Sequence, residues 1–479
     1  MAKGKRFSKN QISAIRATGI ADVVTWYNFN DYFDADGKLQ NTEAGTALIF
    51  QGKFDGDELG IHRITIDREI SIIGDYKVRE AVFKNIAIEI ESGNVAVDGL
   101  TMKANVPLGD LIGVRRSGVS ICNMRIDYRC GNESSTAVNI HGEETVRDVI
   151  VKNNKITFVS HVPDDKHHAT AINMVNAKEL LIDHNKIKVS IPALFAKNIS
   201  MEYFMMGLNS VNALRIRETE SAVITDNTLR VMVNGSSKKY ISCHSIYIAG
   251  SEDLLIKGNS ITLKDTHTPQ GRIIAICGVQ CGYSKKVRFI ENRFDLATRG
   301  GVSKGGALHG INHTDSTETE IRKNTFYCNS RGPVSALFLT CMSGKMSDVS
   351  VVGNSIEVSG YAEDDSPYAL VSGVEVQNTT ASISDNTIIV SNKNKEHSSQ
   401  FPVVGVGYVQ RLAGEVSFRV QGNTIRTNGE YTVYTVCPNV RNAVVTDNHL
   451  KAARRKGNDS VKVQTAESSR VENSGRRRA

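Results

Sequence analysis

Arginine, histidine and tyrosine side chains in one stretch of the sequence could together transfer protons and bind an anion. They are Arg215, Arg217, His244 and Tyr247. If the apolar residues that alternate with the two arginines point inward, both arginines point outward, and Tyr247 faces outward one repeat later. A histidine or tyrosine can act as general base or acid, and an arginine can neutralise a carboxylate on a substrate. The stretch is therefore a candidate catalytic site. The alternative is a polar surface whose long side chains are simply solvated.

Further polar residues are candidates for binding a ligand. They are Arg272, His309, His313 and Asp315. No metal site is expected, because the eight cysteines lack the spacing of zinc ligands and no carboxylate trio recurs in adjacent repeats. The sequence also lacks a phosphate-binding glycine loop and a nucleophile elbow. We therefore expect no cofactor.

The elements that must position these side chains are indicated by an asparagine that returns about every 32 residues. It follows a short apolar run and precedes another, as in residues 254–261, Leu-Leu-Ile-Lys-Gly-Asn-Ser-Ile. The recurring residues are Asn123, Asn154, Asn185, Asn227, Asn259, Asn292, Asn324, Asn354, Asn386, Asn423 and Asn448.

Each repeat contains three short runs in which apolar and polar residues alternate, such as 245–248, 254–256 and 260–263. Alternation with a period of two predicts strands with one buried face. Strands that cannot bury this face alone must stack on the next repeat. The sequence therefore predicts an all-β parallel solenoid of about thirteen coils, with three short strands in each coil.

The recurring asparagine is predicted to form a corner between two strands. Asparagine tolerates positive φ better than other residues except glycine. Stacked corners would also let the side-chain amides hydrogen-bond from coil to coil. Gly74 and Gly99 are predicted to occupy the same corner in two earlier coils. These residues are structural in this interpretation, not catalytic.

The pattern divides the chain into three segments. Residues 1–47 form an N-terminal cap or attachment segment with a short helix from Ser8 to Gly19, residues 48–450 form the solenoid, and residues 451–479 form a basic tail expected to be disordered. Nine basic and three acidic residues give this tail +6 of the net charge of +7. The body is nearly neutral, so only the tail is a candidate for contacting nucleic acid. No apolar run is long enough for membrane insertion, and no secretory signal is recognised.

Residues 47–54, 64–74 and 253–261 carry a resemblance to a known family. The sequence resembles the right-handed parallel β-helix superfamily typified by pectate lyases. Within it, the sequence is most similar to the adhesin-like β-helix proteins of methanogenic archaea, and it is also similar to phage tail spikes and fibres. The resemblance implies a right-handed helix and a place on a cell surface or virion. For a virion protein it also implies a homotrimer.

Two functions remain open at the level of the sequence. The favoured one is an elongated, non-catalytic surface or virion protein that binds glycans or protein partners through its solenoid face. The alternative implied by the resemblance is a polysaccharide lyase, epimerase or glycoside hydrolase acting on an acidic polysaccharide, with Ca²⁺ as a possible counter-charge to the substrate. Enzymes of this superfamily act on the outer face of the first strand of each coil, where Arg215, Arg217, His244 and Tyr247 are expected. Fold resemblance alone does not decide between the two.

Overall fold

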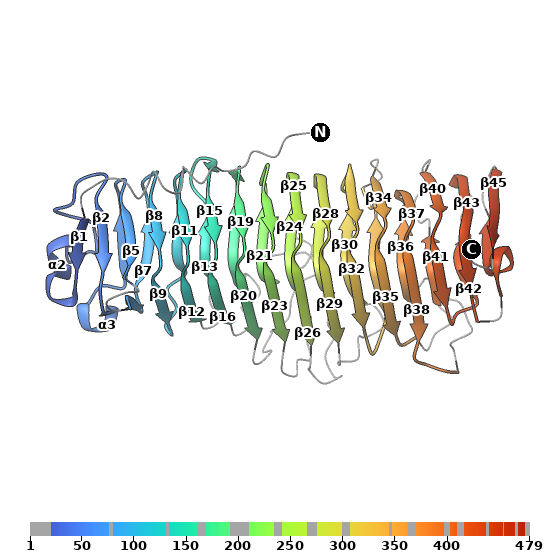
Figure 1. The fold of residues 1–479 in the computed structure, drawn as a ribbon, viewed down its shortest axis with the longest axis horizontal. Coiled ribbons are helices and arrows are strands. Elements are labelled where there is room, and N and C mark those ends of the chain that lie inside the picture. The colour runs from blue at the N-terminus through green and yellow to red at the C-terminus, as the bar shows by residue number, and fades with distance from the viewer. Residues whose placement is uncertain are drawn as a thin grey trace.

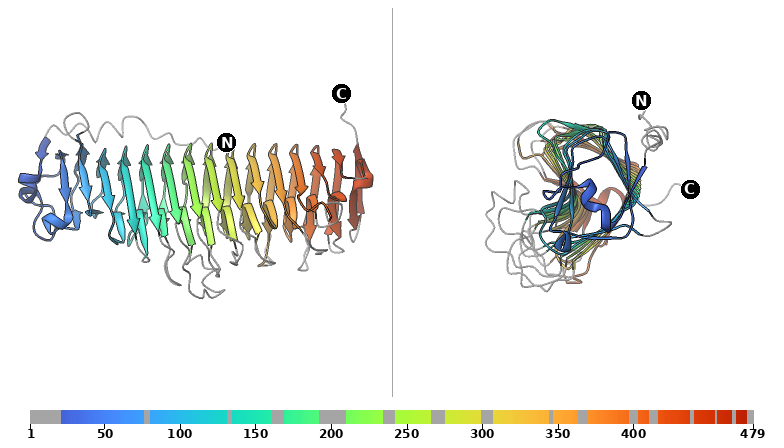
Figure 2. Two further views of the ribbon diagram at one scale, coloured as in Figure 1. Left: turned by 90° about the horizontal axis from the view of Figure 1, so that it is seen from below. Right: turned by 90° about the vertical axis from the view of Figure 1, so that its left-hand side faces the viewer.

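In the computed structural model, the chain winds into one long solenoid that extends from α2 at one end to β45 at the other (Figure 1). The structure describes residues 21–75, 80–130, 134–160, 169–191, 210–233, 242–265, 275–298, 307–343, 347–362, 370–396, 403–409, 416–436, 440–453, 455–464 and 468–474. Seen along its axis, coil lies upon coil (Figure 2). The predicted all-β parallel β-helix is confirmed.

Each typical coil supplies one strand to each of three faces, and neighbouring coils pair through parallel strands. The first face is a 14-stranded sheet. It comprises β4 (Arg63–Ile66), β7 (Ala87–Ile90), β10 (Asp110–Val114), β13 (Ser135–Ile140), β17 (Ala169–Val175), β21 (Ser210–Arg217), β24 (Ser242–Ala249), β27 (Ala275–Gly282), β30 (Ala307–Thr314), β33 (Val334–Thr340), β36 (Val371–Gln377), β39 (Val403–Val409), β42 (Tyr431–Val436) and β44 (Val461–Gln464).

The second and third faces together form a 29-stranded sheet. The second face comprises β1 (Ala21–Val24), β2 (Ala47–Phe50), β5 (Ser71–Gly74), β8 (Ala96–Asp98), β11 (Ser120–Cys122), β15 (Ile150–Lys152), β19 (Leu181–Asp183), β22 (Val223–Thr225), β25 (Glu252–Lys257), β28 (Lys285–Ile290), β31 (Thr319–Arg322), β34 (Asp348–Val352), β37 (Thr380–Ser384), β40 (Val416–Gln421), β43 (Val440–Lys451) and β45 (Ser468–Ser474). The third face comprises β3 (Lys53–Asp55), β6 (Val82–Lys84), β9 (Thr101–Ala104), β12 (Arg125–Cys130), β16 (Lys155–Ser160), β20 (Lys186–Ile191), β23 (Thr228–Val233), β26 (Ser260–Asp265), β29 (Arg293–Thr298), β32 (Thr325–Asn329), β35 (Ser355–Gly360), β38 (Thr387–Asn392) and β41 (Thr424–Thr427). A separate short pair joins β14 (Val146–Arg147) to β18 (Ala177–Lys178).

The core fills the inside of the coils, as the alternating pattern predicts. In the coil formed by β24, β25 and β26, the inward side chains are fully buried. Each coil buries its apolar side chains against those of its neighbours, because a single turn of three strands has too little surface to do so alone. These buried residues are Ile246, Ile248, Leu254, Ile256, Ile261 and Leu263.

From Asn154 onward, the recurring asparagines lie at the corner between the second and third faces, but they are not the residues with positive φ. From Asn154 to Asn448 their side chains form a buried ladder, in which the Asn259 amide donates to Asn292 Oδ1 at 3.0 Å. The residue before each asparagine takes the left-handed conformation instead, as Asp226 (φ 54°) and Lys323 (φ 56°) do. The prediction of positive φ at the ladder residues is wrong, because the amide must point into the coil while the chain turns one residue earlier.

Three members of the predicted corner set, all in the early coils, differ from the rest. Asn123 (φ 56°) holds the turning position, and Met124 follows it at the ladder position, where its N–H donates to Asn154 Oδ1 at 2.8 Å. Gly99 (φ 78°) also turns the chain as predicted. Gly74 does not have positive φ; a side chain there would collide with the Gly99 carbonyl of the next coil.

The N-terminal end is closed by short helices and aromatic rings. The described residues there include η1 (Trp26–Asn28), α2 (Phe29–Tyr32) and α3 (Gly56–Leu59). Phe29 and Phe33 stack at 4.9 Å, and Phe33 lies 6.3 Å from Phe50 of the first coils. The rings cover apolar side chains that the first strands would expose. The helix predicted from Ser8 to Gly19 lies outside the described residues.

The C-terminal tail is folded over much of its length, so the prediction of disorder from residue 451 is wrong there. The tail contains η2 (Gly457–Ser460), β44 and β45. Asn473 extends the ladder, because its Oδ1 accepts from the Asn448 amide at 2.7 Å. The frame of the earlier coils is not repeated here: Val471 lies two residues before Asn473, whereas Val445, its partner in the preceding coil, lies three residues before Asn448. Within the described residues, no helix is long and apolar enough to cross a membrane.

Candidate functional site

Six residues line up along the solenoid axis on the outer side of the first face, one from each strand of β21, β24, β27, β30, β33 and β36. We call them the axial row. Parallel pairing fixes their alignment, since each residue is the direct partner of the next. At about 4.8 Å per strand the row is about 24 Å long. Its members are Arg215, Tyr247, Gln280, Asn312, Phe338 and Glu375.

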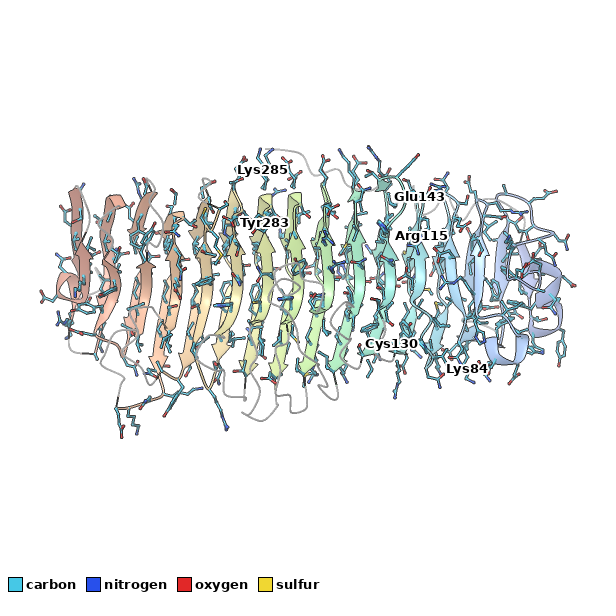
Figure 3. All side chains as sticks on the ribbon, turned by 180° about the vertical axis from the view of Figure 1, so that it is seen from behind. Lys84, Arg115, Cys130, Glu143, Tyr283 and Lys285 are labelled. Carbon is cyan, nitrogen blue, oxygen red and sulfur yellow. The ribbon has the colours of Figure 1, made fainter. Side chains whose placement is uncertain are left out.

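A hollow of about 180 Å³ opens over the middle of the axial row. Two aromatic rings, Tyr247 and Phe338, lie on either side of the amides of Gln280 and Asn312. Tyr283, with 62% of its surface exposed, stands at the rim, and Figure 3 shows it beside Lys285. The described lining contains no Asp, Glu, Lys or Arg. It consists of His244, Tyr247, Ile248, Ala249, Gln280, Gly282, Tyr283, Asn312, Thr314, Phe338, Thr340 and Met342.

The structure places His244 and Tyr247 together on β24. Their ring centroids are 5.5 Å apart, and His244 Nδ1 lies 3.1 Å from Asn212 Oδ1. His244 is only 2% exposed, and this burial lowers its pKa to about 3. Burial also raises the pKa of Tyr247, although the charges of Arg215 and Arg217 oppose the shift. At neutral pH the imidazole is uncharged and the phenol keeps its proton. Neither group has a pKa near neutral pH, as an effective general base would.

The two arginines of β21 take different environments. Arg215 is 3% exposed and donates from Nη1 to Asn173 Oδ1 at 3.1 Å, while its buried Nε has no hydrogen-bond partner. Burial, assisted by the nearby charge of Arg217, lowers the pKa of Arg215 to about 10, so it remains a cation at neutral pH. Arg217 is half-buried and pairs with Glu218 at 3.0 Å. Arg215 thus belongs to the axial row, and Arg217 lies two residues further along the strand.

The remaining candidate binding residues do not gather into one site. His309 stacks on Phe338 at 4.9 Å, which places it beside the hollow, and burial lowers its pKa to about 4. His313 is fully buried and lies 3.0 Å from Thr319 Oγ1, so the prediction that it binds a ligand is wrong. His313 lies two residues after the core residue Ile311 on β30, so its side chain points to the same inner side of the strand. Arg272 lies outside the described residues.

Asp315 stabilises a turn. Its Oδ1 accepts hydrogen bonds from the N–H groups of Met342 and Ser343, at 2.8 and 2.9 Å, and from the Ser343 hydroxyl at 2.8 Å. Burial favours a raised pKa for Asp315, but these donors outweigh it and lower the pKa. All three donors bind Oδ1, and Oδ2 is buried without a hydrogen-bond partner among the described residues, so that oxygen is not open to a ligand from solvent.

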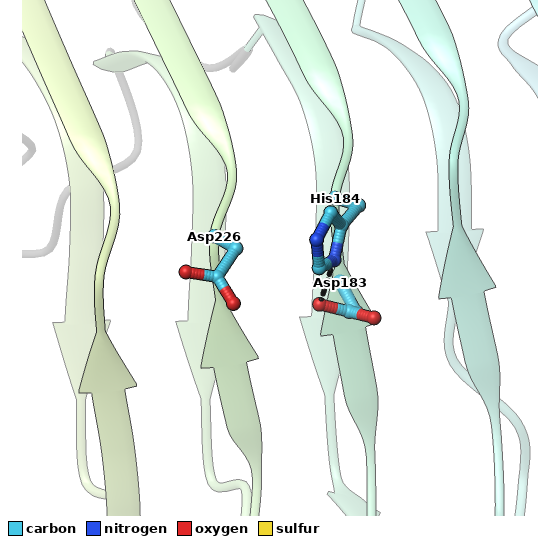
Figure 4. A group of neighbouring side chains, drawn as sticks. All are labelled: Asp183, His184 and Asp226. Atoms are coloured by element: carbon cyan, nitrogen blue, oxygen red, sulfur yellow. Dashed lines mark hydrogen bonds and ion pairs between the residues drawn. The ribbon is translucent and has the colours of Figure 1, made fainter.

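Asp183, His184 and Asp226 bring their potential ligand atoms within 4.8 Å of one another at the turn before the ladder (Figure 4). Asp183 already pairs with Lys152 at 2.8 Å and lies 2.5 Å from His184 Nδ1. Burial favours a raised pKa for Asp183, yet the contacts with Lys152, His184 and Thr225 lower it. Lys152 supplies the positive charge that a metal would bring, so we assign no metal to this cluster.

Several residues of this surface were not recognised in the sequence. Gln280, Asn312, Phe338 and Glu375 belong to the axial row, although no motif surrounds them. The one available signal was that each occupies a position in the first strand of its coil where the alternating pattern directs side chains outward. Glu375 is 5% exposed and accepts from the Gln377 amide at 2.7 Å.

The comparisons with known proteins return structures and no sequence families. No family model matches the chain, and no curated protein matches it. DFA-IIIase from Arthrobacter chlorophenolicus A6 without its lid is similar with a TM-score of 0.42 and 12% identity, over 92% of each chain. PfbA, a surface adhesin of Streptococcus pneumoniae, gives 0.37 and 10%, over 90% of this chain and 91% of the other. A mutant tailspike protein of E. coli bacteriophage HK620, in complex with a pentasaccharide, gives 0.27 and 13%, over 92% and 72%.

Proposed function

We propose that this protein binds glycan chains on the outer side of its first face without cleaving them. The observation that carries the proposal is the hollow over the axial row, in which two aromatic rings flank two amide side chains. Aromatic faces pack against the apolar face of a sugar ring, and amides both donate to and accept from sugar hydroxyls. The hollow is open and small, as a site for one or two sugar units on a longer chain would be.

The chemistry of the lining favours a neutral sugar. None of the described lining residues is an acid, a lysine or an arginine, and His244 is uncharged at neutral pH because burial holds its pKa near 3. A carboxylated sugar placed there would lose its hydration without gaining a counter-charge inside the hollow. We therefore expect neutral glycans to bind over the hollow better than acidic ones.

The same residues argue against catalysis. Glycoside hydrolysis generally needs two carboxyl groups on either side of the scissile bond. Among the six residues of the axial row, Glu375 alone has a carboxylate. It lies beyond Phe338, outside the lining of the hollow. Tyr247 would need a lowered pKa to act as a lyase base, whereas burial raises it.

Binding measurements on aromatic variants test this proposal. We expect the purified protein to bind neutral hexasaccharides of glucose or N-acetylglucosamine, and Tyr247→Ala and Phe338→Ala to weaken binding about tenfold, which is about 1.4 kcal/mol. Tyr327→Ala is the matched control, because this partly exposed tyrosine lies on β32 of the third face under Arg293. Isothermal titration calorimetry gives the affinities. Equal binding by Tyr247→Ala, Phe338→Ala and the control would contradict the proposal.

A cleavage assay on the same panel separates binding from catalysis. New reducing ends or unsaturated ends would favour the enzymatic alternative. In that case Arg217→Ala and Tyr247→Phe should abolish activity without unfolding the protein. Activity that survives both changes would remove these residues from the site. A place on a cell surface or virion, and a homotrimeric state, stay predictions of the resemblance.

A further inference from the structure

A second and larger hollow, of about 860 Å³, lies on the second face near the C-terminal end of the solenoid. It crosses β31, β34, β37, β40, β43 and β45, which pair in this order, and the last five are labelled side by side in Figure 1. One aligned row of outward residues passes through it from strand to strand. The row is Glu320, Ser350, Ser382, Arg419, Val444 and Arg470.

The hollow exists because short side chains lie between long ones. Ser350, Thr380, Ser382 and Ser417 form a floor of hydroxyl groups. We call this floor, together with Arg419, the serine trough. Glu320 stands at one end of the aligned row and Arg470 at the other. Inward neighbours on the same strands are buried in the core, so the floor is firmly supported.

The charges around the serine trough are compensated unequally. Glu320 pairs with Arg322 at 2.6 Å, and Glu318 pairs with Lys285 at 3.4 Å. Arg470 pairs with Glu472 at 2.9 Å. Arg419 is exposed and makes no ion pair with another residue of the described part of the chain. Asp348, in the same lining, accepts the Glu318 N–H at 3.0 Å and makes no ion pair with another described residue. The trough therefore presents hydroxyl groups next to one unpaired guanidinium on β40, with an unpaired carboxylate two strands away on β34.

We propose that the serine trough binds an acidic oligosaccharide, with a carboxylate or sulfate of the sugar on Arg419. A guanidinium binds such groups through two parallel hydrogen bonds. The serine and threonine hydroxyls can donate and accept, which matches the hydroxyl groups of a sugar. The Glu320 end disfavours a chain with an acid on every unit across the whole row, so the acidic unit lies toward β40.

A peptide strand is a poorer occupant of the same surface. Strand addition requires an unpaired sheet edge. The central strands β34, β37 and β40 each pair with a strand on both sides, so their backbone groups are already used. Recognition in the trough must therefore come from side chains. This site is separate from the hollow over the axial row in position, in charge and in the sugar it selects.

Calorimetric titration with a tetrasaccharide that carries a single glucuronate unit, and with a sulfated carrageenan tetrasaccharide as a second anion, tests the proposal. We expect Arg419→Ala to weaken binding of the preferred anion about tenfold or more. Ser382→Leu should weaken it as well, because the leucine fills the floor without entering the core. Raising the salt concentration should weaken binding by the unchanged protein.

Two variants serve as controls, one for the loss of a positive charge outside the trough and one for a change in the other proposed site. Arg426→Ala removes an exposed arginine of β41 on the third face, outside the trough, and should leave binding unchanged. Tyr247→Ala should leave it unchanged too, so failure of the proposed neutral-glycan site and failure of this one are distinguishable. Wild-type protein that binds neither anion, or an Arg419→Ala variant that binds as tightly as wild type, would overturn the proposal. Equal affinity for hexaglutamate would also overturn it, because the sugar would then contribute nothing.

Discussion

At the scale of single residues, burial sets the protonation of three histidines. His244 and His309 lie on the outer side of the first face, and His313 lies inside the coil. Burial lowers the pKa of His244 to about 3, and the pKa values of His309 and His313 to about 4. In an unfolded chain the same side chains titrate near 6.5, so the folded state resists protonation that the unfolded state accepts.

This difference predicts that the free energy of unfolding decreases as the pH falls. A folded-state pKa below the unfolded value gives stability that is complete above about pH 6.5 and is lost progressively down to about pH 4. One pKa unit corresponds to about 1.4 kcal/mol. Urea unfolding at several pH values should show that His313→Gln flattens this slope. His62→Gln is the control, since His62 is exposed, and an equal flattening there would contradict the prediction.

At the scale of the structural elements, the ladder corner joins the second and third faces through buried amides. Asn292 is 1% exposed and donates to the Ile256 carbonyl at 2.8 Å and to Asn324 Oδ1 at 3.0 Å. Its own Oδ1 accepts from the N–H and the amide of Asn259, both at 3.0 Å. A second ladder of hydroxyls supports the other end of the second-face strands, where the Ser251 N–H donates to Ser284 Oγ at 3.2 Å.

Removing one ladder amide should leave several buried polar groups without partners. We expect Asn292→Ala to lower the free energy of unfolding by about 2–4 kcal/mol, since each such group costs about 1–3 kcal/mol. Asn123→Gly is the control: this residue is exposed and has positive φ, which glycine adopts without strain. Denaturant unfolding measures both. A similar, small loss for the two variants would show that the corner depends on backbone conformation and not on the ladder.

At the scale of the whole molecule, a solenoid is stabilised by contacts between neighbouring coils, so its ends need closure. Aromatic rings close the N-terminal end. At the C-terminal end, Asn473 donates to Asn458 Oδ1 from its N–H at 2.7 Å, which ends the ladder in η2. Val461, Val463 and Val471 pack against the core there.

Truncation after Lys456 should therefore destabilise the whole solenoid. It removes η2, β44 and β45 and exposes β43 and the last ladder amides, at an expected cost of about 2–4 kcal/mol. Thermal unfolding followed by circular dichroism measures the loss, and a dye that binds apolar surface reports the exposed end. Removal of residues 475–479 alone is the control and should change neither. Equal melting temperatures for the full chain and both truncated proteins would mean that the tail does not stabilise the C-terminal end of the solenoid.

The sequence by itself determined the class of fold. The two-residue alternation and the asparagine frame are local patterns, and strands with this pattern can bury their apolar side only by stacking. The corner chemistry is local as well, yet the sequence placed the left-handed turn one residue too late, because it does not show which way the amide of Asn259 points. The last coil was missed because Val471 lies two residues before Asn473, not three, so the sequence there does not match the frame of the other coils.

Only the tertiary structure decided which side chains meet. The spacing of the ladder varies between coils, from 25 residues between Asn423 and Asn448 to 42 between Asn185 and Asn227. Register on the first face therefore cannot be counted from the sequence, and the alignment of Tyr247 with Gln280 and Phe338 emerged from strand pairing. Burial, which sets the pKa of His244, depends on neighbours that are distant in the chain. The serine trough depends on register and on burial together, because a hollow forms only where short side chains from separate coils are aligned.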